Sequence, residues 1–218
     1  MGPPERSGRV SRVAMTPDEF YVRVRDASDA EGRLPLSRMT GWEIFPFEPG
    51  NLRVVPLAPP QFPEPDRGGE GSNPCGPCAT PVPGIWANGR WRLTALTESG
   101  APLVLMLMPA AHYDLTDLPD DLAAELGTLI VHVSRAIEAL PNVARAHVSR
   151  WGDGGAHLHV FFFARPAGFP QLRGTCLAIW DDLLPAVPPE NRAADAAAVA
   201  AALAASCGGT ATGLAAAP

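Results

Sequence analysis

The strongest constraint on the fold is a long amphipathic stretch at residues 117–140. Its apolar residues recur at the spacing of a helix that buries one face, and they are Leu122, Leu126, Leu129, Ile130, Val133, Ile137 and Leu140. Acidic residues open the stretch and Asn142 follows its end, as is typical of helix starts and stops. The sequence therefore predicts one long helix with a single buried face.

Strand-like segments lie on both sides of this helix. Before it, Asn88-Gly89 separates two short apolar runs, which is a strong hairpin signal, and residues 102–109 form a continuous apolar run typical of a buried strand. After it, residues 144–152 and 157–166 alternate between two faces, as strands do. This order of elements is typical of an α+β domain with an antiparallel sheet.

The regions flanking these elements suggest further parts of the chain. We expect a flexible tail (1–15), an N-terminal extension with a Pro/Gly-rich arm (16–74), a main domain (75–188) and an Ala-rich helical tail (189–218). Thr16 and Glu19 form a capping-box pattern around Pro17, which predicts a helix to about residue 27. We also expect a short strand at residues 52–57 and fraying after residue 206.

Composition excludes several classes of protein. A content of 46% hydrophobic and 18% charged residues is that of a soluble globular protein. The net charge of -6 argues against a nucleic-acid binder, although a local site for a small nucleotide can still be positive. The longest apolar run, residues 101–111, is too short to span a bilayer, and the N-terminus lacks an apolar signal segment. We therefore expect no membrane association and a cytoplasmic location.

Cys75 and Cys78 form a C-x-x-C pair. Two thiolates at this spacing can chelate one zinc ion from a tight turn, but the same pattern also occurs in redox pairs or by chance. A redox pair normally opens a helix, and residues 79–84 are poorly suited to start one. We favour zinc, which then needs two further ligands.

Three histidines are candidates for chemistry. His112 follows the apolar run at 102–109, and His157 and His159 alternate on one predicted strand. Alternate residues of a strand share a face, so both rings are expected at the same site. The competing interpretation is that they are structural histidines at a sheet edge.

The order of these motifs between Cys75 and Pro166 resembles the histidine triad (HIT) superfamily. C-x-x-C, a turn, a buried strand ending in P-x-x-H, a long helix and an H-x-H strand follow one another as in its zinc-containing members and its galactose-1-phosphate uridylyltransferase branch. The resemblance implies a HIT-like antiparallel sheet with one long helix. Residues 75–188 would be the HIT-like zinc-containing domain, between a helical or extended N-terminal extension and the Ala-rich tail.

The resemblance also implies two roles for the histidines. Zinc, the implied cofactor, would be held in a closed structural site by Cys75, Cys78, His112 and His157. His159 matches the residue that attacks the α-phosphate of a nucleotide in relatives, and neutral imidazole is a suitable nucleophile. The implied activity is that of a nucleotidyltransferase or a nucleotide phosphoanhydride hydrolase.

Further residues are candidates for binding a nucleotide or another phosphorylated small molecule. Asn88 is a candidate because it lies in a turn, and Asp153 and Gly154 because backbone N–H groups of their loop can contact a phosphate. Guanidinium groups can bind phosphate through two hydrogen bonds, which adds Arg150, Arg165 and Arg173. For the arginines we favour the competing interpretation, that they are solvated surface residues. Relatives are commonly dimers, so the resemblance also implies a homodimer.

Three positions depart from the family pattern, and they carry Leu96, Gly154 and Phe161. Their side chains cannot supply the family's contacts to ribose and phosphate. The alternative function is therefore a catalytically degenerate HIT-fold module that binds a ligand or partner and keeps only a structural zinc. A third reading, a zinc hydrolase, requires an open site with three protein ligands.

Overall fold

The computed structural model describes residues 15–212. The predicted flexible tail therefore lies outside the described residues, Met15 excepted, as do residues 213–218 of the C-terminal tail. The chain divides into a smaller unit, Met1–Trp42 with Phe47–Glu64, and a larger unit, Glu43–Pro46 with Pro65–Pro218. Each unit is described by itself.

The smaller unit begins with helix α1 (Pro17–Asp26), as predicted. The capping box is complete, because the Thr16 N–H donates to the Glu19 carboxylate at 2.7 Å and the Glu19 N–H donates to the Thr16 hydroxyl at 3.2 Å. Short 3-10 helices follow, η1 (Arg38–Gly41) and η2 (Pro49–Asn51).

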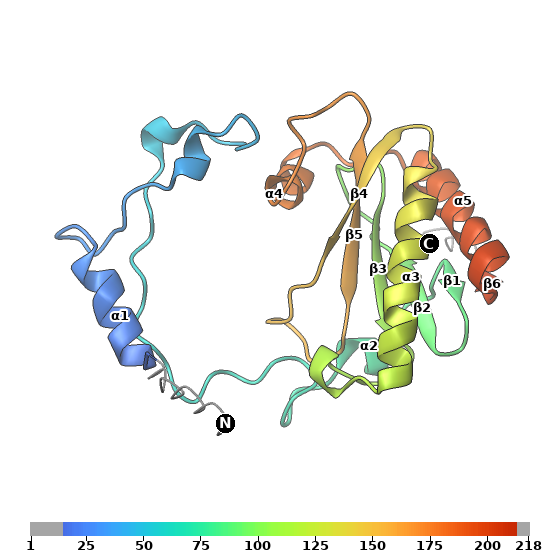
Figure 1. The fold of residues 1–218 in the computed structure, drawn as a ribbon, viewed down its shortest axis with the longest axis horizontal. Helices are drawn as coiled ribbons and strands as arrows, with labels where there is room; N and C mark the ends of the chain where they lie inside the picture. The colour runs from blue at the N-terminus through green and yellow to red at the C-terminus, as the bar shows by residue number, and fades with distance from the viewer. Residues whose placement is uncertain (1–14, 213–218) are drawn as a thin grey trace, which may run out of the picture. The chain divides into compact units, whose positions relative to one another are not determined.

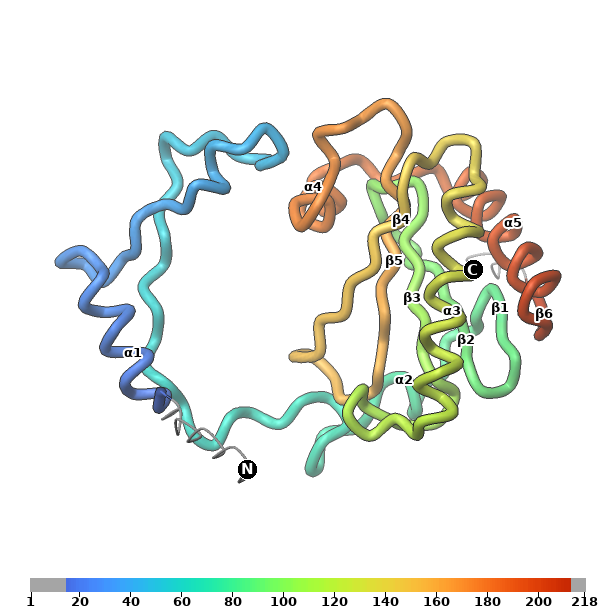
Figure 2. The backbone as a smooth tube through the Cα atoms, viewed as in Figure 1, coloured from blue at the N-terminus to red at the C-terminus, as the bar shows by residue number. Residues whose placement is uncertain are grey.

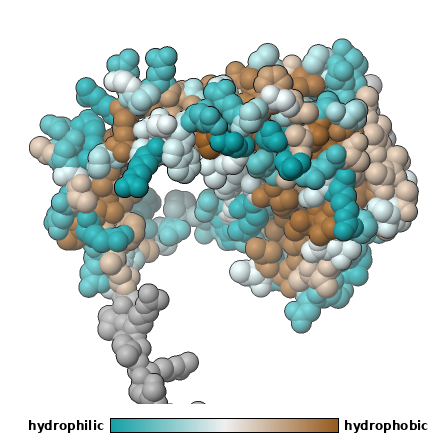
Figure 3. Space-filling model, turned by 45° about the horizontal axis from the view of Figure 1, so that its top comes forward, coloured by the Kyte–Doolittle hydropathy of each residue, from teal (hydrophilic) through white to brown (hydrophobic). Residues whose placement is uncertain are grey.

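The predicted strand at residues 52–57 is wrong, because that segment runs extended without a strand partner among the described residues. None of the described side chains of the smaller unit is buried, and several large apolar ones are exposed: Met15, Phe20, Leu36, Trp42 and Phe62. Hydrophobic groups accordingly appear on its surface among hydrophilic ones (Figure 3). This unit has no hydrophobic core of its own within the described residues.

The larger unit is built on one antiparallel sheet (Figure 1). Its strands are β1 (Trp86–Ala87), β2 (Trp91–Ala95), β3 (Val104–Pro109), β4 (Val143–Ser149), β5 (Val160–Pro166) and β6 (Thr210–Ala211). They lie in the order β4-β5-β3-β2-β1-β6, and every neighbouring pair is antiparallel. The predicted α+β class with an antiparallel sheet is confirmed.

The β1–β2 hairpin turns at the predicted Asn88-Gly89 pair. The Asn88 side-chain oxygen accepts hydrogen bonds from the N–H groups of Arg90 at 3.0 Å and Trp91 at 2.8 Å. Gly89 has φ 84°, a left-handed conformation that glycine adopts without a Cβ clash. These two residues therefore account for the tight turn between β1 and β2.

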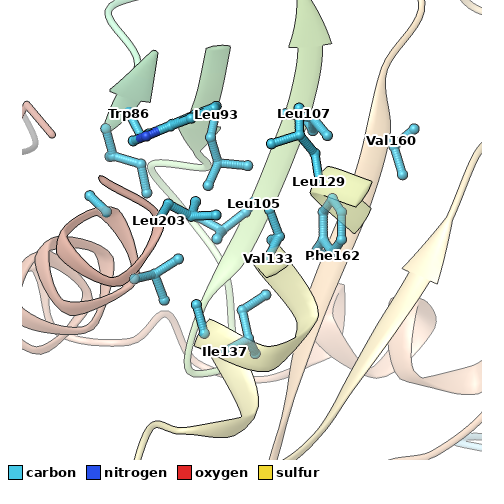
Figure 4. Close-up of a cluster of buried hydrophobic side chains, with 14 of the residues drawn as sticks. Trp86, Leu93, Leu105, Leu107, Leu129, Val133, Ile137, Val160, Phe162 and Leu203 are labelled. Carbon is cyan, nitrogen blue, oxygen red and sulfur yellow. The ribbon is translucent and has the colours of Figure 1, made fainter. Parts of the chain in front are cut away.

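One face of the sheet is covered by α3 (Asp120–Glu138) and α5 (Pro189–Cys207). Figure 4 shows side chains of both helices meeting strand residues in this core: Trp86, Leu93, Leu105, Leu107, Leu129, Val133, Ile137, Val160, Phe162 and Leu203. The long helix is confirmed at the predicted place. No helix within residues 15–212 is long and apolar enough to span a membrane.

The end of the described chain is held rather than frayed. Strand β6 pairs with β1, placing Ala211 opposite Trp86, and the Trp86 indole N–H donates to the Gly208 carbonyl at 2.9 Å. The expected fraying is therefore wrong for residues 207–212, because β1 would otherwise be an unpaired sheet edge.

The other face of the sheet is only partly covered. At one end, Leu177 of α4 (Cys176–Leu183) packs with Val104 and Phe163. Residues 43–46 join the same end, where the Trp180 indole N–H donates to the Ile44 carbonyl at 2.9 Å. The short helix α2 (Gly76–Ala79) carries Cys78 toward the other end of the sheet. We call the sheet surface opposite α3 and α5 the open face.

Candidate metal centre and adjoining histidine

His157 and His159 lie immediately before β5, which begins at Val160 rather than at His157 as predicted. The strand starts late because the Leu158 N–H donates to the Tyr113 carbonyl, at 2.7 Å, in the loop that follows β3. Side chains nevertheless alternate as expected. Leu158 lies in the core under α3 and α5, as do Val160 and Phe162, so the two histidines are directed to the open face.

The structure brings together the four residues predicted as metal ligands. Cys75 caps α2 and Cys78 lies within it, His112 follows β3, and His157 precedes β5. One ligand atom from each of the four lies within 4.8 Å of the others. Three segments far apart in the sequence thus converge on one Cys₂His₂ cluster.

The spacing of the ligand atoms fits a tetrahedral metal ion. The His157 Nδ1 atom lies 3.5 Å from Cys75 Sγ and 3.4 Å from Cys78 Sγ, and His112 Nδ1 lies 3.6 Å from Cys78 Sγ. Zinc bonds of about 2.3 Å to sulfur and about 2.0 Å to nitrogen place neighbouring S and N ligands about 3.5 Å apart in a tetrahedron. The donor set and its dimensions therefore both suit zinc.

His157 is held in the form that a metal needs. Its side chain is 2% exposed, and its Nε2 atom lies 3.0 Å from the Pro109 carbonyl oxygen. That contact makes Nε2 the protonated nitrogen and leaves the Nδ1 lone pair directed at the two thiols. Burial is the main cause that lowers the pKa of His157, which favours the neutral ring that binds metal.

The redox reading of the cysteine pair is less well supported than the metal reading. A helical turn follows Cys75, but it is only 4 residues long, and residues 80–84 do not continue it. Desolvation, and then the hydrogen bond with Cys75, raise the pKa of the Cys78 thiol. Redox-active cysteines require the opposite shift. The geometry of the cluster thus favours metal ligation over thiol chemistry.

Gly69 contacts the cluster and was not identified as a site residue from the sequence. A Cβ atom at this position would lie 2.7 Å from His112 Cε1 and 3.4 Å from Cys75 Cβ. Its φ of 93° is also one that other residues rarely adopt. The Pro/Gly-rich composition of residues 58–74 signalled irregular structure, but only the folded chain shows which glycine faces the ligands.

We predict that Gly69→Ala weakens metal binding by about tenfold or more, a typical loss when the support of a ligand is disturbed. The added methyl group would push the His112 ring from its place. Competition with a chromophoric zinc chelator measures the affinity. Gly71→Ala is the control, since Gly71 also has a positive φ, of 53°, while its Cβ would meet Asp66 instead of a ligand. Equal affinities of the two variants would contradict the steric explanation.

An ion-pair cluster joins the segment before Cys75 to the loop before His157. Arg67 lies 2.9 Å from the Asp114 carboxylate and donates to the Gly152 carbonyl at 2.7 Å, and Arg150 forms a second ion pair with Asp114. Alongside, Gly68 pairs with the loop through a bridge to Gly155. Figure 2 follows this segment of the chain to α2 at the end of the sheet. The network fixes the loop that leads into the histidines.

Asp114 gives this network a pH dependence. Burial alone would raise its pKa, but the Leu115 N–H and the guanidinium groups of Arg67 and Arg150 outweigh burial and hold the pKa below its usual value. A carboxyl group with a lowered folded-state pKa stabilises the protein above its unfolded pKa, and this contribution is lost as pH falls through the folded value. The stability that ionised Asp114 contributes is therefore lost as the pH falls below about 4.

We predict that Asp114→Asn lowers the free energy of unfolding at pH 7 by about 2 to 3 kcal/mol, because two guanidinium groups lose their carboxylate. The difference between the two proteins should shrink as pH falls below about 4, where the native carboxyl is protonated too. Urea unfolding across this pH range measures it. A difference that stays constant down to pH 2 would show that Asp114 does not act through its charge.

The remaining candidate residues are spread around the larger unit. Arg150 pairs with Asp114, Arg165 donates to the Phe169 carbonyl at 3.2 Å, and Arg173 pairs with Glu43 at 2.6 Å. Asn88 lies in the hairpin turn and also donates to Glu125 at 2.8 Å, while Asp153 and Gly154 are exposed in the loop before His157. Among these, the structure places Arg150, Asp153 and Gly154 nearest in the chain to the histidines.

His159 has a defined orientation beside the metal cluster. Its Nδ1 atom lies 2.8 Å from the backbone carbonyl of His157, so Nδ1 carries the proton and Nε2 keeps its lone pair. The ring is half-buried and meets the edge of Phe161 with centroids 5.4 Å apart. Trp151 packs on the same phenyl ring at 5.5 Å. His159 thus presents a free imidazole nitrogen on the open face.

The fold is similar to those of several solved histidine triad proteins. A histidine triad protein from Bradyrhizobium japonicum is 23% identical over 54% of this chain and 87% of its own, with a TM-score of 0.44. A Zn-bound histidine triad family protein from Mycobacterium smegmatis is 17% identical over 57% and 86%, with a TM-score of 0.42. A hypothetical histidine triad nucleotide-binding protein from Sulfolobus tokodaii is 15% identical over 58% and 90%, also with a TM-score of 0.42.

No protein-family model and no curated protein matches this sequence.

Proposed function

We propose that the larger unit is a histidine triad-like enzyme that acts on a nucleotide or a related phosphoanhydride with His159 as nucleophile. The observation that carries the proposal is the orientation of His159. Its Nδ1 atom is bonded to the His157 carbonyl, and its Nε2 atom is free beside the Cys₂His₂ cluster. A nucleophilic imidazole requires a ring that is held in place by one nitrogen and keeps the lone pair of the other.

In this proposal Cys75, Cys78, His112 and His157 hold zinc as a closed structural site. Bound zinc supplies no reacting group there and only fixes its ligands. Because His157 also provides the carbonyl that accepts the His159 Nδ1–H, fixing the His157 residue fixes the orientation of the neighbouring imidazole. The metal centre would therefore orient the His159 ring through the backbone carbonyl of His157.

The chemistry proposed for His159 has two steps. Its Nε2 lone pair attacks the α-phosphorus, a P–N bond forms, and the bond from that phosphorus to the leaving phosphate oxygen breaks. The His157 carbonyl, which accepts from Nδ1–H, stabilises the positive charge that develops on the ring. Water or an acceptor phosphate then attacks the phosphorus and the P–N bond breaks, returning neutral His159.

The experiment is incubation with radiolabelled nucleoside diphosphate sugars and dinucleoside polyphosphates. An acid-labile, base-stable adduct on the protein should appear, and it should map to His159 in peptide mass spectra. Its absence with every member of both substrate classes, in zinc-loaded protein, would refute the proposed reaction. We further propose that the chain forms a homodimer, which sedimentation of the protein at several concentrations tests.

A second candidate function is a ligand-binding module without catalysis, and two observations favour it. The three candidate phosphate-binding arginines already pair with Asp114, the Phe169 carbonyl and Glu43. Phe161 and Trp151 form an aromatic cluster at the third triad position, where a phosphate contact would be expected. For this candidate, equilibrium binding of nucleotides without any adduct or turnover is the expected outcome.

A further inference from the structure

A cavity of about 410 Å³ lies on the open face beside the metal cluster. Residues from three elements line it, among them Pro77 of α2, Arg92, Thr94 and Leu96 of β2 and its end, and Met106 and Met108 of β3. Its volume lies in the range of pockets that hold small organic molecules. Most of these walls are apolar, so the cavity suits a ligand with an apolar body.

Arg92 differs from the other lining residues because it carries a charge. One of its amino groups donates to the Pro77 carbonyl at 2.9 Å, whereas its Nε atom is buried without a hydrogen-bond partner. Within residues 15–212, no Asp or Glu carboxylate forms an ion pair with it, although Arg67, Arg90, Arg150 and Arg173 each have one. Arg92 therefore lines the cavity with a guanidinium charge that no carboxylate neutralises, and an anion in the cavity could pair with it.

We propose that this cavity binds a small organic anion, with its apolar body against Leu96 and Met106 and its carboxylate or phosphate group on Arg92. Charge complementarity selects the headgroup, because a guanidinium fork matches the oxygens of both anions. The apolar walls favour a ligand whose remaining part is apolar. The proposal concerns binding alone and does not depend on any reaction at His159.

The strand register places this cavity next to the candidate nucleophile. Met106 lies opposite Phe161 and Leu107 opposite Val160 in the β3–β5 pair, so Met108 lies beside the segment that carries His159. A ligand in the cavity would share the open face with the imidazole. If the proposed function holds as well, the anion on Arg92 becomes a specificity element for the part of the substrate that lies over β2.

The test uses three naphthalene compounds of similar size and calorimetric titration of the full chain. The probes are 1-naphthyl phosphate, 1-naphthoate and the neutral 1-naphthamide, measured in the unmodified protein and in His159→Ala. We expect at least one anion to bind about tenfold tighter than the amide, the size of effect expected for one charge-assisted contact. The preference should be the same in both proteins, so that failure of the catalytic proposal leaves this test intact.

Arg92→Gln should lower the affinity of the tighter-binding anion to that of the amide. Arg92→Lys should keep part of the preference for the anion over the amide. Arg145→Gln, an exposed arginine on β4, is the control that removes the same charge elsewhere. Leu96→Trp should block all three probes by filling the cavity, and it keeps the proposal testable should Arg92→Gln not fold. Equal binding of anions and amide, an anion preference that survives Arg92→Gln, or unchanged binding in Leu96→Trp would overturn the proposal.

Discussion

Cys75→Ser is expected to release the metal and to lower the free energy of unfolding by more than about 3 kcal/mol, since loss of a metal is among the few single-residue changes with so large an effect. The serine hydroxyl is a poor zinc ligand, and the remaining three ligands come from α2, the loop after β3 and the start of β5. Without the ion, these segments keep only the Asp114 ion pairs and a few backbone hydrogen bonds between them. Elemental analysis and urea unfolding of the purified variant measure the two effects.

Cys207→Ser is the matched control for this change. Cys207 is partly buried at the end of α5, outside the Cys₂His₂ cluster, so the same substitution there should leave metal content unchanged. Unmodified protein that contains no metal after purification with zinc present would refute the metal centre. Equal losses of stability in the two variants would show that the thiol of Cys75 contributes only packing.

His159→Gly is expected to lower turnover of a phosphoanhydride substrate by at least about 10³-fold, because removal of a nucleophile typically costs this much or more. The half-buried ring donates one hydrogen bond and contacts Phe161, so the loss of stability should be small by comparison. Added imidazole should restore part of the rate by occupying the space of the missing ring. Steady-state kinetics with and without imidazole measure both effects.

His132→Gln provides the control, because His132 lies on α3 and belongs to neither the metal cluster nor the open face. It should retain the full rate and show no response to imidazole. A His159→Gly protein that turns over substrate at the unmodified rate would remove the nucleophile from the proposed mechanism. Such an outcome would favour the binding-module candidate if nucleotide affinity were retained.

Periodic segments were predictable because each one is specified by residues close together in the sequence. The apolar stripe of α3 needs only a helical period, and the β1–β2 turn needs only Asn88 and a glycine that adopts a positive φ. The convergence of Cys75 and His157 was inferred from the order of motifs. The structure brings the two side chains to 3.5 Å through sheet pairing that no local pattern encodes.

The irregular segments were not predictable for the same reason. The segment around Gly69 has no period, so its docking against residues 152–155 depends on backbone contacts such as the Gly68 N–H to the Gly154 carbonyl. The extended residues 52–57 have an apolar composition like that of a strand, but no strand is available to pair with them among the described residues. Arg92 was overlooked because only the folded sheet shows that it lacks a carboxylate partner.

X-ray absorption at the zinc edge of the purified protein tests the proposed metal centre directly. A closed Cys₂His₂ centre predicts two sulfur ligands at about 2.3 Å and two nitrogen ligands at about 2.0 Å, with the metal bound one to one. The spectrum of His159→Ala should be unchanged, because His159 adjoins the cluster without belonging to it. An oxygen ligand in place of one histidine nitrogen would contradict the closed site and would support an open, hydrolytic zinc centre instead.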